Sequence, residues 1–187
     1  DQYGGTLAKD FGSIVLKGEA VYTHGRDFYV TTPTDSDGVV PKNTLDWALG
    51  LDFSLPADTR LNLQVFQRLF FDYNPDLLAD KRENGYSVLL NHKLTDKLEV
   101  GAAAVEDRNP YAEFKMGSVN AGYRFGENTM LVAEFARTQS EVNTNSLNQV
   151  TSQGLKDVTG QVEGDAWRVE FAHDGDKFDA RLFGART

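Results

Sequence analysis

Few residues of this chain stand in a pattern that is typical of a catalytic site. Its three histidines, His24, His92 and His173, are the side chains best suited to acid–base chemistry near neutral pH. No two of them stand four residues apart, as zinc ligands on a helix do, and no serine lies in a Gly-x-Ser-x-Gly turn. The absence of cysteine excludes disulfides, thiolate metal centres and cysteine nucleophiles. We therefore predict no catalytic residues, no cofactor and no enzymatic activity, and we interpret the histidines as residues of turns and interfaces.

One acidic segment has the spacing with which a calcium loop begins. Asp35-Ser36-Asp37-Gly38 matches that opening, but the later oxygen ligands and the terminal glutamate are missing. Aspartate and glycine also favour an ordinary turn that needs no metal. The pair Asp174 and Asp176 offers still fewer ligands. The sequence therefore predicts no metal site.

Charged side chains that alternate with apolar ones are the strongest functional candidates. Inside a wet barrel such charges can pair across neighbouring strands and set the selectivity of a pore. They can equally form a salt-bridged plug, because a barrel of about eight to ten strands is just wide enough for its own side chains. Both interpretations stay open at this point. The residues predicted to line the lumen are Lys17, Glu19, Asp46, Asp52, Arg68, Arg124, Glu134, Arg168, Glu170 and Arg181.

The alternation that contains these charges predicts β-strands. From Leu45 to Leu55 every odd position is large and apolar, and every even position is small or acidic. Because successive side chains of a strand point to opposite faces, one face is apolar and the other polar. In a membrane barrel the apolar face contacts lipid. The residues predicted to face lipid are Leu45, Trp47, Leu49, Leu51, Phe53, Leu61, Leu63 and Val65.

Weaker segments of the same kind bring the prediction to about nine strands, and residues 3–11 are a candidate for a partial tenth strand. Between Met116 and Val119 the apolar positions change from even to odd, and a β-bulge at Gly117-Ser118 would explain the change. Aromatic residues gather near the strand ends, as they do in the girdles of membrane barrels.

The connections alternate strictly between short turns and longer links. In an up-and-down arrangement this places all short turns at one end and all long links at the other. The long links also hold most of the net negative charge. The short turns are residues 56–59, 94–97, 126–128 and 173–176, and the long links are 26–42, 72–84, 106–113 and 139–165.

Length and charge narrow the class of protein. The 187 residues suffice for one domain with a sizeable core, so we predict a single β-barrel domain over residues 1–187. A net charge of −9 argues against a nucleic-acid partner, which requires a basic face. No apolar run approaches the roughly 20 residues of a membrane-spanning helix. The prediction is an all-β, antiparallel up-and-down transmembrane β-barrel of about 8–10 strands, or a segment of a larger barrel.

Two other interpretations fit the same alternation. A soluble antiparallel β-barrel would turn the apolar face inward around a small apolar ligand. Whether Trp47, Leu49 and Leu51 contact lipid or a core distinguishes it from a membrane barrel. A surface adhesin or receptor would instead act through its long acidic loops, above all residues 139–165.

Lys-Gly-Glu-Ala-Val-Tyr-Thr at 17–23 and Asn-Thr-Leu-Asp-Trp-Ala-Leu-Gly-Leu-Asp at 43–52 begin a series of motifs that continues at 55–62, 67–72 and 90–98. Through them residues 12–100 resemble a proteobacterial outer-membrane β-barrel family of unknown function. The resemblance implies a large barrel in the bacterial outer membrane, with a structural or porin-like transport role in the export or handling of apolar or lipid-like compounds. No catalytic residues come with it.

The second half of the chain differs, because residues 164–171 and 178–186 resemble barrel segments of large bacterial surface proteins instead. Bacterial single-chain barrels have an even number of strands, and nine is odd. A sheet edge in lipid would leave unsatisfied backbone groups that cost several kcal/mol each. We therefore expect the lipid bilayer as a partner. We also expect closure by residues 3–11 as a tenth strand, by further strands of a longer chain, or by a partner chain.

Overall fold

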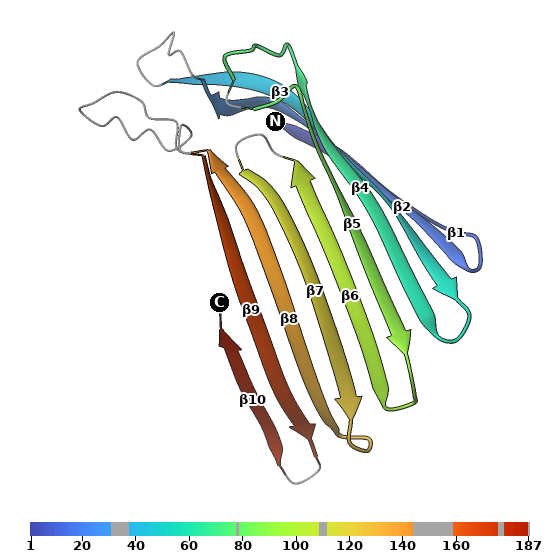
Figure 1. Ribbon diagram of the computed structural model, residues 1–187. Helices are drawn as coiled ribbons and strands as arrows, with labels where there is room; N and C mark the ends of the chain where they lie inside the picture. Colours follow the sequence, from blue (N-terminus) through green and yellow to red (C-terminus); the bar gives the residue numbers. More distant parts are fainter. Residues whose placement is uncertain (31–37, 78, 109–111, 144–158, 176–177, 187) are drawn as a thin grey trace.

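In the computed structural model the chain forms one antiparallel sheet of ten strands, in which each strand pairs with the next along the sequence (Figure 1). The structure describes residues 1–187 except 31–37, 78, 109–111, 144–158, 176–177 and 187. The strands are β1 (Gln2–Asp10), β2 (Ile14–Tyr29), β3 (Val39–Leu55), β4 (Thr59–Phe71), β5 (Arg82–Lys93), β6 (Leu98–Arg108), β7 (Ala112–Arg124), β8 (Thr129–Asn143), β9 (Thr159–Asp174) and β10 (Asp179–Arg186).

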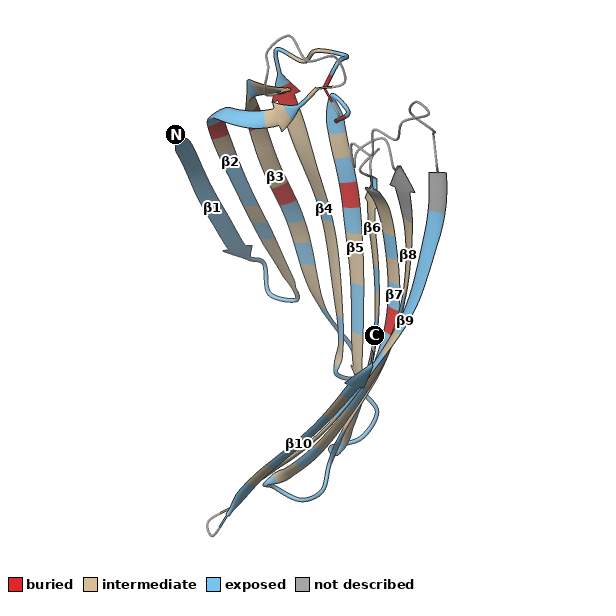
Figure 2. Ribbon diagram, turned by 90° about the vertical axis from the view of Figure 1, so that its left-hand side faces the viewer, coloured by how far each residue is buried: buried red, intermediate tan, exposed pale blue. Residues whose placement is uncertain are grey.

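The sheet is curved and open, with β1 and β10 as its two edge strands (Figure 2). The all-β, antiparallel, up-and-down fold that the alternation predicts is confirmed, in the form of an open sheet. The predicted tenth strand is also confirmed, because β1 covers nearly all of residues 3–11. Within the part of the chain that the structure describes, no helix is long and apolar enough to cross a membrane.

Short turns join the strands at one end of the sheet. They follow β1, β3, β5, β7 and β9, whereas β2, β4, β6 and β8 all end at the opposite side (Figure 1). Gly12 (φ +85°) and Gly126 (φ +77°) supply the left-handed conformation that two of these tight turns require. We refer to the two sides as the turn end and the loop end.

The predicted β-bulge at Gly117-Ser118 is wrong. β7 pairs with both β6 and β8 through this point without a register shift. Phe114 and Met116 therefore lie on the same face as Ser118. The apolar residues of this strand lie on one face as far as Met116 and on the other face from Val119 onward, while the backbone pairing continues without a shift.

The strands next to two of the predicted links are longer than the sequence pattern indicates. β6 ends at Arg108 and β7 begins at Ala112, so most of the predicted link 106–113 is strand. β8 and β9 likewise extend into the predicted link 139–165. The apolar alternation does not reveal these extensions, because charged residues occupy the positions that apolar residues hold closer to the turn end.

A similar extension occurs between β2 and β3. β2 runs to Tyr29 and β3 begins at Val39, so both strands enter the predicted link 26–42. The register shift of this strand pair lies between Thr23 and Arg26 of β2. The pairing of β2 with β3 is therefore irregular at this point, and the sequence pattern does not predict it.

A small hydrophobic cluster, the loop-end core, lies where β4 leaves the sheet. Leu77 is 1% exposed and forms an isolated bridge with Val30. The Tyr73 hydroxyl donates a hydrogen bond of 3.0 Å to the carbonyl of Ala79. Part of the predicted link 72–84 therefore folds back against the strand ends. The loop-end core consists of Phe70, Leu77 and Ala79, with Phe28, Val30, Val40 and Tyr73 packed against them.

Candidate functional site

The strand register sorts the predicted site residues onto two faces of the sheet. Side chains directly opposite one another in neighbouring strands lie on the same face. Asp46 of β3, for example, lies opposite Arg68 of β4 and Val21 of β2. We call the face that contains Asp46 the polar face. It holds all ten residues predicted to line the lumen, namely Lys17, Glu19, Asp46, Asp52, Arg68, Arg124, Glu134, Arg168, Glu170 and Arg181.

The opposite side of the sheet is the apolar face. Leu49 and Val65, which pair across β3 and β4, are each 48% exposed, so the described part of the chain leaves this face largely uncovered. All eight residues predicted to face lipid lie here: Leu45, Trp47, Leu49, Leu51, Phe53, Leu61, Leu63 and Val65.

The sheet curls toward its polar face. Curvature brings side chains together on the concave side, and the strand residues that are most buried lie on the polar face. These residues are Thr23, Thr44, Ala48, Phe70, Gly85 and Ser118.

A hollow of about 390 Å³ opens on this face toward the loop end. Its lining includes Glu19, Asp46, Arg68, Glu83 and Asp107, so carboxylates outnumber basic groups there. The hollow spans β2 to β6, which means that five consecutive strands contribute to it. Three of the residues predicted to line the lumen, Glu19, Asp46 and Arg68, therefore lie around one hollow.

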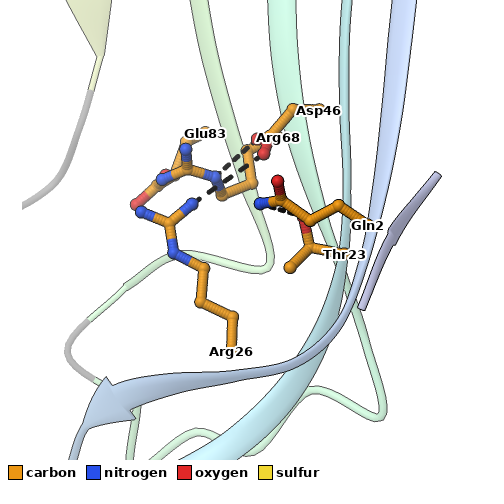
Figure 3. Close-up of polar contacts among 6 residues, drawn as sticks. All are labelled: Gln2, Thr23, Arg26, Asp46, Arg68 and Glu83. Atoms are coloured by element: carbon orange, nitrogen blue, oxygen red, sulfur yellow. Dashed lines mark hydrogen bonds and ion pairs between the residues drawn. The ribbon is translucent and has the colours of Figure 1, made fainter. Parts of the chain in front are cut away.

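Arg68 lies at the centre of these charges (Figure 3). Its Nε is 2.6 Å from Oδ1 of Asp46, and its Nη1 is 3.3 Å from Oε2 of Glu83. Nη1 of Arg26 is 4.0 Å from the second oxygen of Asp46. The Arg26 guanidinium also lies 5.4 Å from the centre of the Phe28 ring, which belongs to the loop-end core. This loop-end charge cluster therefore connects β2, β3, β4 and β5 beside that core.

Burial changes the acidity of two carboxyl groups at the hollow, both on the loop-end side of the apolar stretches of β5 and β6. Loss of solvent raises the pKa of Glu83, and the neighbouring Arg68 guanidinium opposes that rise. Loss of solvent also raises the pKa of Asp107, again against the attraction of Arg68. Arg68 is therefore the group that favours the ionised form of both carboxyls.

Charge pairs also join strands elsewhere on the polar face, as the alternation predicts. Asn62 of β4 donates a further hydrogen bond to the Asp52 carboxylate. Glu19 and Arg124 form no ion pair with the described residues. The ion pairs that join neighbouring strands here are Lys17–Asp52 at 2.5 Å, Arg168–Glu134 at 3.4 Å and Arg181–Glu170 at 3.4 Å.

Two of the three histidines form the same contact at the turn end. Nδ1 of His92 lies 2.7 Å from the Thr59 hydroxyl, and Nδ1 of His173 lies 2.7 Å from the Thr129 hydroxyl. In each case the threonine is the residue directly opposite on the neighbouring strand. His24 is an exposed residue at the register shift of β2. The structure therefore brings the histidines to three separate places and not into one site.

No group of three histidine or acidic side chains in the described ranges could hold a metal ion. Residues 35–37 of the calcium-like segment and Asp176 lie outside the described residues, as do residues 144–158 of the link considered for adhesion.

The sequence patterns missed a set of charges on the apolar face, which we call the outer charge belt. Five of these residues lie in the predicted links 106–113 and 139–165, and Lys115 and Arg137 lie just outside them. All seven continue the strand alternation: Glu106, for example, follows Val100, Ala102 and Ala104 at every second position. That continuation was the signal that could have found them. The outer charge belt consists of Glu106, Arg108, Glu113, Lys115, Arg137, Glu163 and Asp165.

No protein-family model, no curated protein and no solved structure matches this chain. The resemblance of residues 12–100 to an outer-membrane family therefore stays a prediction. The fold and the register define the class of this protein: an open antiparallel sheet of ten strands with one apolar and one charged face.

Proposed function

We propose that this chain forms the wall of a bacterial outer-membrane β-barrel with a structural or porin-like transport role. In this proposal the apolar face contacts the lipid chains and the polar face lines the interior. The proposed cargo is the class that the family resemblance implies, apolar or lipid-like compounds. The chain acts by binding and guiding molecules, without a catalytic step.

The position of the apolar stretches along the strands is the observation that supports the proposal most. On β3 the stretch runs from Leu45 to Phe53, nine residues, which matches the roughly 9–11 residues of a transmembrane strand. The centre of this stretch is Leu49. Moving from each residue to the one directly opposite it on the next strand leads from Leu49 of β3 to Glu163 of β9. The centre of the apolar stretch on β9 is Val169, six residues away. Relative to this row of paired residues, the centre of the apolar stretch is therefore displaced by six residues over the six steps from β3 to β9, which is about one residue for each step.

A flat layer of lipid explains this displacement. Strands of a barrel tilt by roughly 35–45° to the barrel axis, so a membrane meets each successive strand at a different residue. One residue, about 3.4 Å, for each inter-strand spacing of about 4.8 Å corresponds to a tilt of roughly 35°. The drift of the apolar stretch therefore has the size that a membrane-spanning barrel requires.

Aromatic pairs mark both borders of the apolar stretches. At the loop end the rings of Tyr22 and Phe71 meet edge to face with centres 5.9 Å apart. At the turn end Tyr123 and Phe125 do the same at 4.7 Å. Amphipathic aromatic rings favour the two interfaces of a membrane, which is why barrels have girdles at these levels.

The soluble interpretation requires the opposite arrangement of the faces. An apolar ligand in a soluble barrel would lie against Leu49 and Val65, so these side chains would have to line the concave side. The most buried strand residues, such as Thr44, Ala48 and Phe70, lie instead on the face of Asp46 and Arg68. The geometry therefore favours a membrane barrel over a soluble ligand-binding barrel.

The test compares refolding of the chain with and without detergent micelles, followed by circular dichroism and by gel migration before and after boiling. We expect a β spectrum, a single species and slower migration after boiling only when detergent is present. A monodisperse β protein in plain buffer would contradict the proposal. Single-channel conductance of the inserted protein would then distinguish an open pore from a salt-bridged plug.

Two leucine substitutions test the assignment of the faces. Leu49→Arg places a charge on the proposed lipid face and should cost about 2–4 kcal/mol and prevent insertion. Leu89→Arg is the matched control, because Leu89 is 38% exposed and lies opposite Asn62 on the polar face. We expect this control to insert. Normal insertion of Leu49→Arg, measured by the same gel assay, would refute the lipid assignment.

A further inference from the structure

The two edge strands of the sheet carry large apolar side chains that stand largely uncovered. Leu182 and Phe183 of β10 are 69% and 64% exposed, and Tyr3 of β1 is 66% exposed. Phe183 lies opposite Glu170 and therefore on the polar face, where lipid would not cover it under the proposed function. A further strand placed beside each edge would cover these side chains on both faces.

The backbone of each edge strand limits how another strand can pair with it. Asp1 and His24 exchange backbone hydrogen bonds, so the odd residues of β1 bond to β2 and the even ones direct their N–H and C=O groups toward the open edge. The Gly175 N–H donates to the carbonyl of Phe178, so on β10 the odd residues are directed outward. If the two edges pair, even residues of β1 lie opposite odd residues of β10.

The displacement of the apolar stretches selects one register for such a pairing. Followed back over two steps from Leu49 of β3, a displacement of about one residue for each step puts the centre of the stretch at Gly5 of β1. Followed forward over one step from Val169 of β9, it puts the centre at Phe183 of β10. One more step with the same displacement, from β10 to a β1 strand, sets Gly4 opposite Phe183.

The sizes of the side chains select the same register independently. A shift by two residues in one direction would set Gly5 opposite Gly184 and Leu7 opposite Leu182, which leaves a gap beside a crowded pair. In the register derived from the apolar stretches, each large apolar residue lies opposite a glycine or an alanine. The pairs are Tyr3–Gly184, Gly4–Phe183, Gly5–Leu182 and Leu7–Ala180.

A shallow hollow beside β1 gives one of these side chains room. It has a volume of about 440 Å³ and is lined mostly by residues of the apolar face, among them Gly5, Gly18 and Trp47. No atom lies within 4 Å of the position that a Cβ at Gly5 would occupy. Directly paired residues have their Cβ positions about 4.5–5.5 Å apart, so Leu182 opposite Gly5 would lie over this hollow.

The curvature of the sheet and one lumen charge indicate which β1 strand lies there. β1 and β10 of one copy do not pair, and they lie apart in both views (Figure 1 and Figure 2). Glu19 lies at the centre level of the apolar stretches, one step from Leu49, and forms no ion pair with the described residues. A ten-stranded barrel is just wide enough for its own side chains, and burial of an unpaired charge is costly. A wider barrel would keep Glu19 in water.

We propose that β10 of one copy pairs with β1 of a second copy, with Gly5 opposite Leu182, and that two copies close one barrel. Ten strands from each copy make twenty, an even number that keeps every neighbouring pair antiparallel. Barrels of 16–18 strands already enclose an aqueous channel. This inference rests on the proposed function, because it is the lipid that requires both edges to be paired.

Cross-linking tests the pairing, because the chain contains no cysteine of its own. Leu7→Cys combined with Ala180→Cys places two thiols on a directly opposite pair without mutual backbone hydrogen bonds, where Cα atoms lie about 4.5 Å apart, within the range of a disulfide. After folding of the whole chain in detergent micelles and oxidation, we expect a covalent dimer on a denaturing gel without reductant.

Leu7→Cys combined with Leu182→Cys is the matched control, displaced by two residues. We expect it to give little cross-linking, because its Cα atoms would lie beyond the range of a disulfide. A cross-linked monomer of the first variant would mean that a chain closes on its own edge and would overturn the proposal. Absence of any cross-link, or equal cross-linking in the control, would refute the register.

A glycine substitution tests the fit of the side chains. Gly5→Leu has room within its own copy but would crowd Leu182 of the second copy, so the dissociation constant of the dimer in micelles should rise at least about fivefold. Gly117→Leu is the matched control, since Gly117 lies on the apolar face of β7 and its Cβ position is equally open. It should leave the dissociation constant unchanged, and equal effects of the two variants would contradict the proposal.

The mass of the folded particle separates this inference from the proposed function. Light scattering of the protein in micelles should give two copies for each particle. A protein that folds in micelles as a monomer refutes this inference alone, whereas a protein that folds as a monodisperse species in plain buffer refutes the proposed function.

Discussion

At the scale of single residues, Arg68 is the side chain on which the polar face depends most. It separates Asp46 from Glu83, whose side chain is 12% exposed, and it faces the partly buried Asp107 across the hollow. Like charges in a poorly solvated site repel strongly, because little water screens them. Removal of the guanidinium would leave these carboxylates without their central cation.

We expect Arg68→Gln to destabilise the folded protein by about 2 kcal/mol. Adding Glu83→Gln to this variant should restore part of the loss, because the second substitution removes one of the repelling charges. Urea unfolding in detergent, followed by tryptophan fluorescence, measures both effects.

Arg181→Gln provides the control for this experiment. Arg181 pairs with Glu170 at 3.4 Å, but its side chain is 77% exposed, so the loss should stay below about 1 kcal/mol. If Arg68→Gln and Arg181→Gln cost the same, the loop-end charge cluster has no special role in stability.

At the scale of secondary-structure elements, the loop-end core ties the connection after β4 to the ends of β2 and β3. The Phe28 and Phe70 rings meet edge to face with centres 4.8 Å apart, and Leu77 covers them from the connection. Apolar packing of this kind is unusual in this sheet, where the described strands bury few large side chains. The contact holds part of a long connection beside the mouth of the polar hollow.

Leu77→Ala should cost about 2–5 kcal/mol in the stability of this local packing. Because the strand ladder does not depend on Leu77, we expect residues 72–81 to become sensitive to protease while the β spectrum in detergent stays unchanged. Limited proteolysis of the folded protein measures the first effect and circular dichroism the second.

The matched substitution is Leu94→Ala in the turn between β5 and β6, where Leu94 is 52% exposed. This control should change neither protease sensitivity nor the spectrum. Resistance of residues 72–81 in the Leu77→Ala protein would mean that the loop-end core does not hold the connection.

At the scale of the whole molecule, the two open edges determine how the sheet can exist in lipid. Each unpaired N–H or C=O group within the hydrocarbon layer costs several kcal/mol, so a stable inserted form must pair β1 and β10. β1 runs toward the turn end and β10 away from it, so the two edges are antiparallel to one another (Figure 1). We therefore propose that the chain closes on itself or on a partner chain when it enters a membrane.

Hydrogen exchange of the protein in lipid bilayers tests this closure. We expect the amides of β1 and β10 to be protected as strongly as those of the central strands β5 and β6. Fast exchange confined to the two edge strands would show that the sheet stays open in lipid. The mass of the folded species then distinguishes closure within one chain from closure between chains.

The sequence by itself determined the class of fold and the composition of the two faces. Alternation with a period of two is a local property, since each side chain of a strand points away from its neighbour whatever the strand pairs with. For this reason Leu45 to Leu55 could be assigned to a strand, and its odd residues to one face, without knowledge of any partner. The short turns could be found in the same way, from residue types that favour tight turns.

Only the tertiary structure decided which residues lie opposite one another. Alternation fixes the face of Arg68 but not its register, and pairing of β3, β4 and β5 places it between Asp46, 22 residues before it, and Glu83, 15 residues after it. Pairing of β6, β7, β8 and β9 likewise assembled the outer charge belt from strand segments that lack an apolar pattern. Register depends on long-range hydrogen bonding between strands, and a periodic pattern allows several registers, so these sites could not be derived from the order of the residues alone.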